Sequence, residues 1–213
     1  MNKIYIFSGL GVDQRVFDNI DFGNLDVEFI DWIEPLKNES LDSYAKRIAQ
    51  NLTVPNPTLI GLSFGGMVAV EISKILQTKK IVLIASAKTK SELPEIYQLA
   101  GKLKINKLIP NQLLTKQNFI TNWFFGLETK SDKQLLKRIL KDTNPNFLSW
   151  AINEILNWKN EVQLNNCLHI HGNKDRIIPV EIVKADFVIE NGGHFMTVNK
   201  AEEIERIIKQ ICE

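Results

Sequence analysis

The feature that most restricts the fold of this chain is an alternation of short, almost wholly apolar runs with longer segments of helical periodicity. The apolar runs have the pattern of strands buried on both faces. They cover residues 3–8, 27–32, 58–62, 80–86, 166–171 and 186–190. Apolar residues at three- and four-residue spacing, typical of helices, cover residues 40–52, 65–77 and 199–212. This alternation predicts an α/β fold with a mainly parallel sheet of about six strands and helices on both faces.

Residues 88–162 interrupt the alternation with a stretch that has helical patterns and no convincing strand. The patterns cover residues 94–107, 111–125, 131–141 and 145–158, and proline or glycine separates them. We therefore expect a helical cap inserted between two strands of a single domain that spans residues 1–213. One core is expected because typical domains have about 100–200 residues.

The predicted cap is rich in aromatic side chains. Trp123, Phe124, Phe125 and Trp150 lie within its helical segments. An aromatic helical layer above a sheet makes a suitable roof for an apolar pocket, so we expect these four side chains to bind substrate. The alternative is that they form a small second core against the sheet.

Charge and composition narrow the classes of partner. The chain has 26 Lys and Arg against 25 Asp and Glu, which gives no global reason to expect nucleic acid or an anionic membrane as a partner. No segment approaches the roughly 18 apolar residues that cross a bilayer, and the first residues lack the apolar run of an export signal. We therefore expect a cytoplasmic protein that acts on a small molecule. Its cysteines, Cys167 and Cys212, form no metal-binding pair in sequence and are expected in the core.

Residues 61–65, Gly-Leu-Ser-Phe-Gly, match the pattern G-x-S-x-G between a predicted strand and a predicted helix. In this setting the pattern indicates a sharp strand-to-helix turn that holds the serine hydroxyl clear of the sheet. Ser63 is therefore the candidate nucleophile, and the glycines leave room for the turn. The alternative is a glycine-rich turn with an incidental serine.

A serine hydroxyl needs a base, and the chain has three histidines. His169 lies inside an apolar run and His171 at its end, whereas His194 follows two glycines in a loop from which its ring can reach a site. We expect His194 to be the base. Asp175, in the polar loop after the fifth predicted strand, is the candidate acid that orients this base, with a turn-forming role as the alternative. All three candidate groups fall at the carboxyl ends of strands, where sites gather in open α/β sheets.

The loop after the first predicted strand, residues 7–13, has the sequence Phe-Ser-Gly-Leu-Gly-Val-Asp. Its glycines allow backbone N–H groups to approach a substrate closely. We assign the N–H groups of Leu10 and Phe64 to an oxyanion hole. A dinucleotide-binding loop is the competing interpretation, but Gln14 stands where that fingerprint needs its third glycine.

Together these motifs resemble those of the α/β-hydrolase superfamily, over nearly the whole chain. The matching segments are residues 8–11 at the oxyanion loop, 61–66 at the nucleophile elbow, 171–175 at the acid and 193–195 at the base. Residues 9–17 are also similar to the start of bacterial carboxylesterases that act on the methyl ester of a pimeloyl carrier protein. The chain begins at the strand that carries the oxyanion loop, so the resemblance implies a minimal fold. Ser8 stands where many members of the family have histidine.

The resemblance and the candidate residues predict a serine hydrolase that cleaves a carboxylic ester through an acyl-enzyme on Ser63, without a metal or an organic cofactor. Thioesterase, amidase, lyase or perhydrolase chemistry uses the same residues and stays open, as does a ligand receptor that keeps the scaffold without turnover. Dehalogenase and epoxide hydrolase chemistry is disfavoured, because similar enzymes with those activities have Asp at the position of Ser63. Arg15, Lys88 and Lys90 are candidates near the mouth of the site for binding an anionic acyl group or an acyl carrier.

Overall fold

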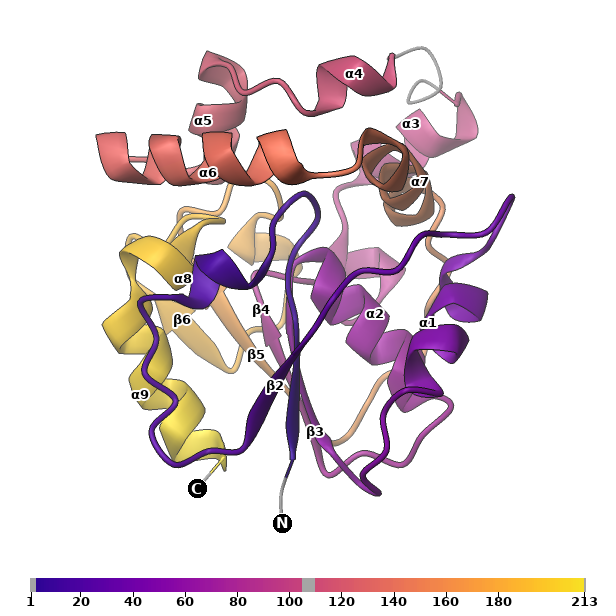
Figure 1. Cartoon of the computed structure of the whole chain (residues 1–213), viewed down its shortest axis with the longest axis vertical. Helices are drawn as coiled ribbons and strands as arrows, with labels where there is room; N and C mark the ends of the chain where they lie inside the picture. The colour runs from indigo at the N-terminus through magenta and orange to yellow at the C-terminus, as the bar shows by residue number, and fades with distance from the viewer. Residues whose placement is uncertain (1–2, 105–109, 213) are drawn as a thin grey trace.

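The computed structural model describes residues 3–104 and 110–212 (Figure 1). Within these residues, six parallel strands form one sheet in the order β2-β1-β3-β4-β5-β6. The strands are β1 (Ile4–Phe7), β2 (Val27–Ile30), β3 (Thr58–Leu62), β4 (Lys80–Ile84), β5 (Cys167–Gly172) and β6 (Phe187–Ile189). The predicted six-stranded parallel sheet is therefore confirmed, with small shifts at the strand ends.

Helices cover both faces of the sheet. Successive strand residues point to opposite sides, so each strand contributes side chains to two cores. Ile4 and Ile6 of β1 belong to the core on the α9 side, whereas Tyr5 and Phe7 belong to the core on the side of α1 and α2. Both faces of the central strands are thus apolar, which explains why the strand runs lack a polar alternation. The covering helices are α1 (Leu41–Ala49), α2 (Phe64–Ser73) and α9 (Ala201–Cys212).

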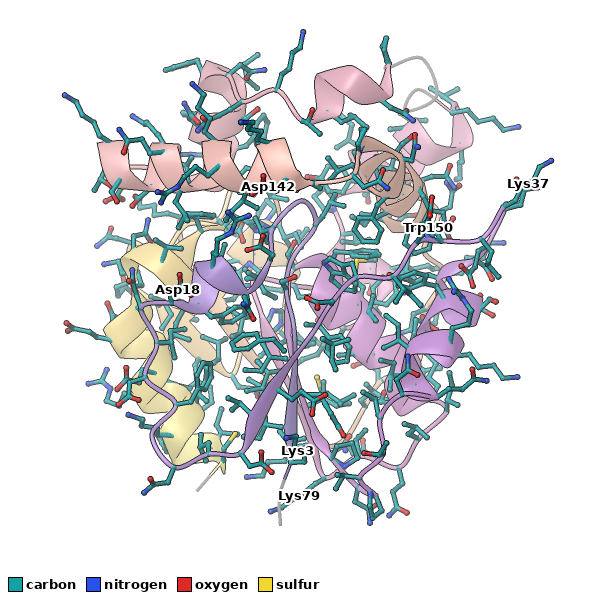
Figure 2. All side chains as sticks on the ribbon, in the orientation of Figure 1. Lys3, Asp18, Lys37, Lys79, Asp142 and Trp150 are labelled. Carbon is teal, nitrogen blue, oxygen red and sulfur yellow. The ribbon has the colours of Figure 1, made fainter. Side chains whose placement is uncertain are left out.

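The chain between β4 and β5 folds into a helical cap above the carboxyl ends of the strands (Figure 1). Side chains from both layers project into the space between this cap and the sheet (Figure 2). The cap elements are η2 (Lys90–Glu92), α3 (Glu95–Lys102), α4 (Asn111–Leu114), α5 (Phe119–Phe125), α6 (Lys130–Asp142) and α7 (Pro145–Leu156).

Two predicted cap helices differ from the structure. The segment expected as one helix over residues 111–125 forms two, α4 and α5. Asn118 separates them, because its backbone is extended and its side-chain oxygen accepts the N–H of Thr121 at 2.9 Å, which starts α5. The helix expected over residues 94–107 corresponds to α3, and the last part of that prediction lies outside the described residues.

The remaining elements are short. They are η1 (Gln14–Phe17), η4 (Val180–Ile182) and α8 (Met196–Asn199). Cys167 and Cys212 are both buried as free thiols. Across residues 3–104 and 110–212, every helix is too short or too polar to cross a lipid bilayer.

Candidate active site

Ser63 occupies a strained turn between β3 and α2. Its φ and ψ are 51° and −119°, a region that residues with a side chain rarely adopt. Its N–H donates to the carbonyl of Ile84 at 2.9 Å, and its carbonyl accepts from Ser86 Oγ at 2.6 Å, so contacts with β4 and the residues after it hold the turn. A Cβ on Gly65 would overlap the carbonyl oxygen of Ser8. Glycine is therefore required where α2 passes the oxyanion loop.

A hydrogen-bonded chain joins Ser63 to His194 and Asp175. His194 Nε2 lies 2.8 Å from Ser63 Oγ, and His194 Nδ1 lies 2.7 Å from Asp175 Oδ2. A carboxylate only accepts hydrogen bonds, so Nδ1 carries a proton, and Nε2 of the neutral ring then accepts from the Ser63 hydroxyl. The structure thus brings together the three residues that the sequence singles out, in the geometry of a base-activated serine.

Asp175 is buried and held by the turn that follows β5. Its Oδ1 accepts the N–H of Ile177 at 2.8 Å and the N–H of Ile178 at 3.0 Å. Burial alone would raise the pKa of this carboxyl, but attraction to His194 and the hydrogen bonds outweigh burial and lower the pKa below its ordinary value. Asp175 is therefore ionised at neutral pH and accepts the hydrogen bond of His194 Nδ1.

Two further histidines extend the chain behind Asp175. His171 Nε2 lies 2.8 Å from the carbonyl of Ile178 and 3.6 Å from Asp175 Oδ2, and His171 Nδ1 lies 3.0 Å from His169 Nε2. A carbonyl only accepts, so His171 Nε2 carries its proton, and a neutral His169 then donates to His171 through Nε2. Burial lowers the pKa of both rings, to about 2 for His169. Both rings are therefore neutral supports of the turn that carries Asp175.

The two residues whose N–H groups are assigned to an oxyanion hole, Leu10 and Phe64, both belong to the lining of the pocket that opens onto Ser63. Phe64 is the first residue of α2, where N–H groups have no partner inside the helix. Among the hydrogen bonds of the described chain, none has the Leu10 N–H as donor. Ser8 turns its hydroxyl to the carbonyl of Val12 at 2.9 Å, so its side chain holds the loop rather than facing a substrate.

An apolar pocket of about 300 Å³ lies between Ser63 and the cap. Sequence reasoning missed the cap lining apart from Phe125: Leu93 before α3, one tyrosine on α3 and aliphatic side chains on α7. The Tyr97 hydroxyl donates to the carbonyl of Ile177 at 2.8 Å, so it presents its ring to the pocket. None of the lining residues that the structure describes is Lys, Arg, Asp or Glu. The cap lining comprises Leu93, Tyr97, Phe125, Ile152, Ile155 and Leu156.

Only one of the four aromatic residues expected to bind substrate lies in this lining. The ring of Phe125 packs edge-on against that of His194, with 5.8 Å between centroids. Trp123 and Phe124 instead face the exterior and are 49% and 39% exposed. Trp123 and Phe124 share α5 with Phe125 but lie on its outer side, so the structure does not bring them to this lining.

Trp150 also differs from the expectation. Its Nε1 donates to the carbonyl of Glu39 at 2.7 Å, and its ring packs on Tyr44 with 4.5 Å between centroids. It joins the cap to the α1 side of the core, while Ile152 and Ile155 of the same helix face the pocket. The apolar spacing along α7 indicates that Ile152 and Ile155 face inward, but neither this spacing nor aromatic character tells which residues face the pocket and which face the core.

The basic residues considered for an anionic acyl group are engaged elsewhere. Each of the three pairs with a carboxylate, and none lines the apolar pocket. The pairs are Arg15 with Asp13, Lys88 with Asp186, and Lys90 with Glu161. In the described part of the chain, no group of three His, Cys, Asp or Glu side chains is arranged to hold a metal ion.

These features define a class of protein. A serine in a strained strand-to-helix turn, followed along the chain by an acid and then a histidine at the carboxyl edge of a parallel sheet, is the arrangement of the α/β-hydrolase fold. The chain has this fold, as its sequence motifs predict.

Solved structures agree with this class. The chain matches a hydrolase from Oleispira antarctica with a TM-score of 0.75 at 14% identity, over 100% of this chain and 91% of that chain. It matches MenH from S. aureus with a TM-score of 0.75 at 17% identity, over 99% and 92% of the two chains. An esterase from Exiguobacterium antarcticum gives 0.70 at 15% identity, over 100% and 92%. Comparison with protein-family models and with curated proteins found no match.

Proposed function

We propose that this protein is a serine hydrolase that cleaves carboxylic esters through an acyl-enzyme on Ser63. The observation that carries the proposal is the hydrogen-bonded series of Ser63, His194 and Asp175, whose Ser63 end opens onto an apolar pocket. The hydrolase and esterase among the solved structures with this fold support the same class of reaction. Fold alone does not decide function, so the proposal rests on the site.

The proposed reaction has two steps. Ser63 Oγ attacks the ester carbonyl carbon while His194 Nε2 takes the hydroxyl proton, and Asp175 stabilises the resulting imidazolium. The N–H groups of Leu10 and Phe64 donate to the oxyanion, and His194 returns the proton to the leaving alcohol. Water, activated by His194 in the same way, then attacks the acyl-enzyme and releases the acid. No step needs a metal or an organic cofactor.

The shape of the pocket favours an uncharged acyl group of small or medium size. A volume of about 300 Å³ lies at the lower end of the roughly 300–1,000 Å³ that is usual for ligand pockets. The described lining has no cation to pair with a carboxylate, and burying an unpaired charge is costly. An acyl carrier as leaving group stays a prediction, because the carrier would lie outside this lining.

The test is a fluorophosphonate label followed by a panel of p-nitrophenyl esters and matched thioesters of graded acyl length. We expect wild type to be labelled and to turn over short and medium acyl esters, and Ser63→Ala to lose both properties. Labelling without turnover of any ester or thioester would favour a ligand receptor. Turnover of thioesters alone would assign a thioesterase. Activity of Ser63→Ala close to that of wild type would refute the assignment of Ser63 as the nucleophile.

A further inference from the structure

The outer side of α5 exposes a compact group of apolar side chains. Phe119, Ile120, Trp123 and Phe124 are 81%, 63%, 49% and 39% exposed, and none of the residues of α5 is buried. Phe119 lies one turn before Trp123, and Ile120 one turn before Phe124, so the four form two adjacent rows. Soluble monomers rarely leave large apolar side chains together in this way without a partner.

Basic side chains adjoin this apolar group. Phe119 and Trp123 line a surface cavity of about 380 Å³ together with Lys133, Lys174 and Arg176, and these three basic residues outnumber the one acidic residue of the lining, Glu128. The Arg176 guanidinium lies 4.6 Å from the ring centroid of Trp123 and donates to the Trp123 carbonyl at 2.7 Å. We call these two aromatic and three basic residues, with Ile120 and Phe124, the α5 patch.

The charge of the chain is unevenly distributed between the cap and the remainder of the sequence. Residues 88–162 contain twelve basic and seven acidic residues, an excess of five positive charges. The remainder has fourteen basic and eighteen acidic residues, an excess of four negative charges. The net charge of the whole chain is near zero and gave no reason to expect an anionic membrane, but the cap by itself is basic. In Figure 1, α4 and α5 form the side of this cap that is farthest from the sheet.

We propose that the α5 patch docks on an anionic lipid surface. Aromatic and aliphatic side chains bordered by Lys and Arg are the combination that binds the boundary between headgroups and acyl chains. The apolar rows of α5 enter this boundary, and Lys133, Lys174 and Arg176 contact the anionic headgroups. A second copy of the chain is a poorer occupant, because the same patch on both copies would bring two basic caps together. Charge complementarity thus selects the anionic surface.

Docking in this way would also orient the active-site pocket. α5 carries the patch on one side and Phe125, which contacts His194, on the other. The pocket would therefore lie near a surface in which apolar esters dissolve. The docking proposal itself goes beyond the proposed hydrolase activity, and its test measures binding alone.

The test is co-sedimentation of the full chain with vesicles of phosphatidylcholine, with and without phosphatidylglycerol. We expect binding to the anionic vesicles, weak binding to the neutral ones, and release at high salt, which screens the cationic contribution. Trp123 provides a reporter in the patch, so binding should shift tryptophan emission to shorter wavelength, and Trp123→Phe should remove this shift. Absence of binding to anionic vesicles at low salt would overturn the proposal.

Two patch variants and one control sharpen the test. Two variants, Phe119→Ser with Ile120→Ser and separately Lys133→Glu, should each weaken binding to anionic vesicles by at least about fivefold. One basic residue near such a surface is worth about that factor, and apolar side chains add to binding through the area that they bury. The control, Leu36→Ser with Lys37→Glu, changes an exposed apolar and an exposed basic residue on a loop apart from α5 (Figure 2) and should bind as wild type. Equal thermal unfolding midpoints show that each variant is folded.

Two outcomes of the variants would overturn the proposal. One is binding by both patch variants at the wild-type level. The other is self-association of the lipid-free protein in sedimentation velocity that Phe119→Ser with Ile120→Ser abolishes, because a second copy would then be the occupant of the patch.

Discussion

The backbone of Ser63 holds a conformation that costs free energy and determines where its hydroxyl lies. A residue with a Cβ in such a region is destabilised by on the order of 1–3 kcal/mol. The hydrogen bonds to Ile84 and from Ser86 hold the turn despite this cost. The strain arises from the Cβ and not from the hydroxyl, so the two parts of the side chain can be separated by substitution.

Ser63→Gly and Ser63→Ala form a matched pair at this position. Both variants lack the nucleophile and should show no ester turnover. Glycine also relieves the strain, and this gain exceeds the roughly 0.4–1 kcal/mol by which its freer unfolded chain opposes folding. We expect Ser63→Gly to be more stable than Ser63→Ala by about 1 kcal/mol in urea denaturation. An alanine variant as stable as the glycine variant would contradict the strain argument.

The sequence predicts the three residues of the hydrogen-bonded chain because each follows a strand in a recognisable local pattern. It does not predict the support behind Asp175. His171 reaches the carbonyl of Ile178 across the turn, and His169 reaches His171 along the strand. These contacts depend on how a turn folds back on a strand, and no local pattern of residue types specifies that geometry.

Among the elements, α7 shows most clearly why a pocket is hard to predict. Its apolar residues have two roles: Trp150 packs on the core, Ile152 lines the pocket that opens onto Ser63, and Ile155 does both. The same sequence pattern serves both roles, since a helix inserted between two apolar layers is apolar on two sides. The strands are easier to predict from sequence than the pocket, because a run such as residues 58–62 is buried on both faces and has one interpretation.

Ile155→Phe should narrow the pocket from the α7 side. Ile155 is half-buried and lines the cavity of about 300 Å³, so added ring volume displaces acyl chain rather than water at the surface. We expect kcat/KM to fall at least about tenfold for the longest acyl esters accepted by wild type and to change little for acetyl esters, since a methylene or two in a pocket is worth about 1–3 kcal/mol. Leu99→Phe, on an exposed position of the cap, is the control. A uniform loss across all chain lengths would contradict this role of Ile155.

At the scale of the whole molecule, the buried histidines make folding sensitive to acid. Burial lowers the pKa of His169 to about 2 and also lowers that of His171. An unfolded histidine has a pKa of about 6.5. Below that pH the unfolded chain binds protons that the folded protein does not, so stability is complete above about pH 7 and falls with acid, by about 1.4 kcal/mol per pH unit for His169. The lowered pKa of His171 adds to the loss in the same direction. Asp175, whose folded pKa is lowered, adds its own loss only below about pH 4.

Urea denaturation at pH 7 and at pH 5 measures this effect in the range where Asp175 does not contribute. His169 alone should remove about 2 kcal/mol of stability between these values. His169→Gln keeps a donor for His171 Nδ1 and removes the titrating ring, so its stability should depend less steeply on pH by about that amount, whatever its stability at pH 7. Because the comparison uses the slope and not the absolute stability, a variant that is merely weakened still gives a decisive answer. A slope equal to that of wild type would mean that His169 is protonated in the folded protein, and the neutral histidine chain behind Asp175 would have to be abandoned.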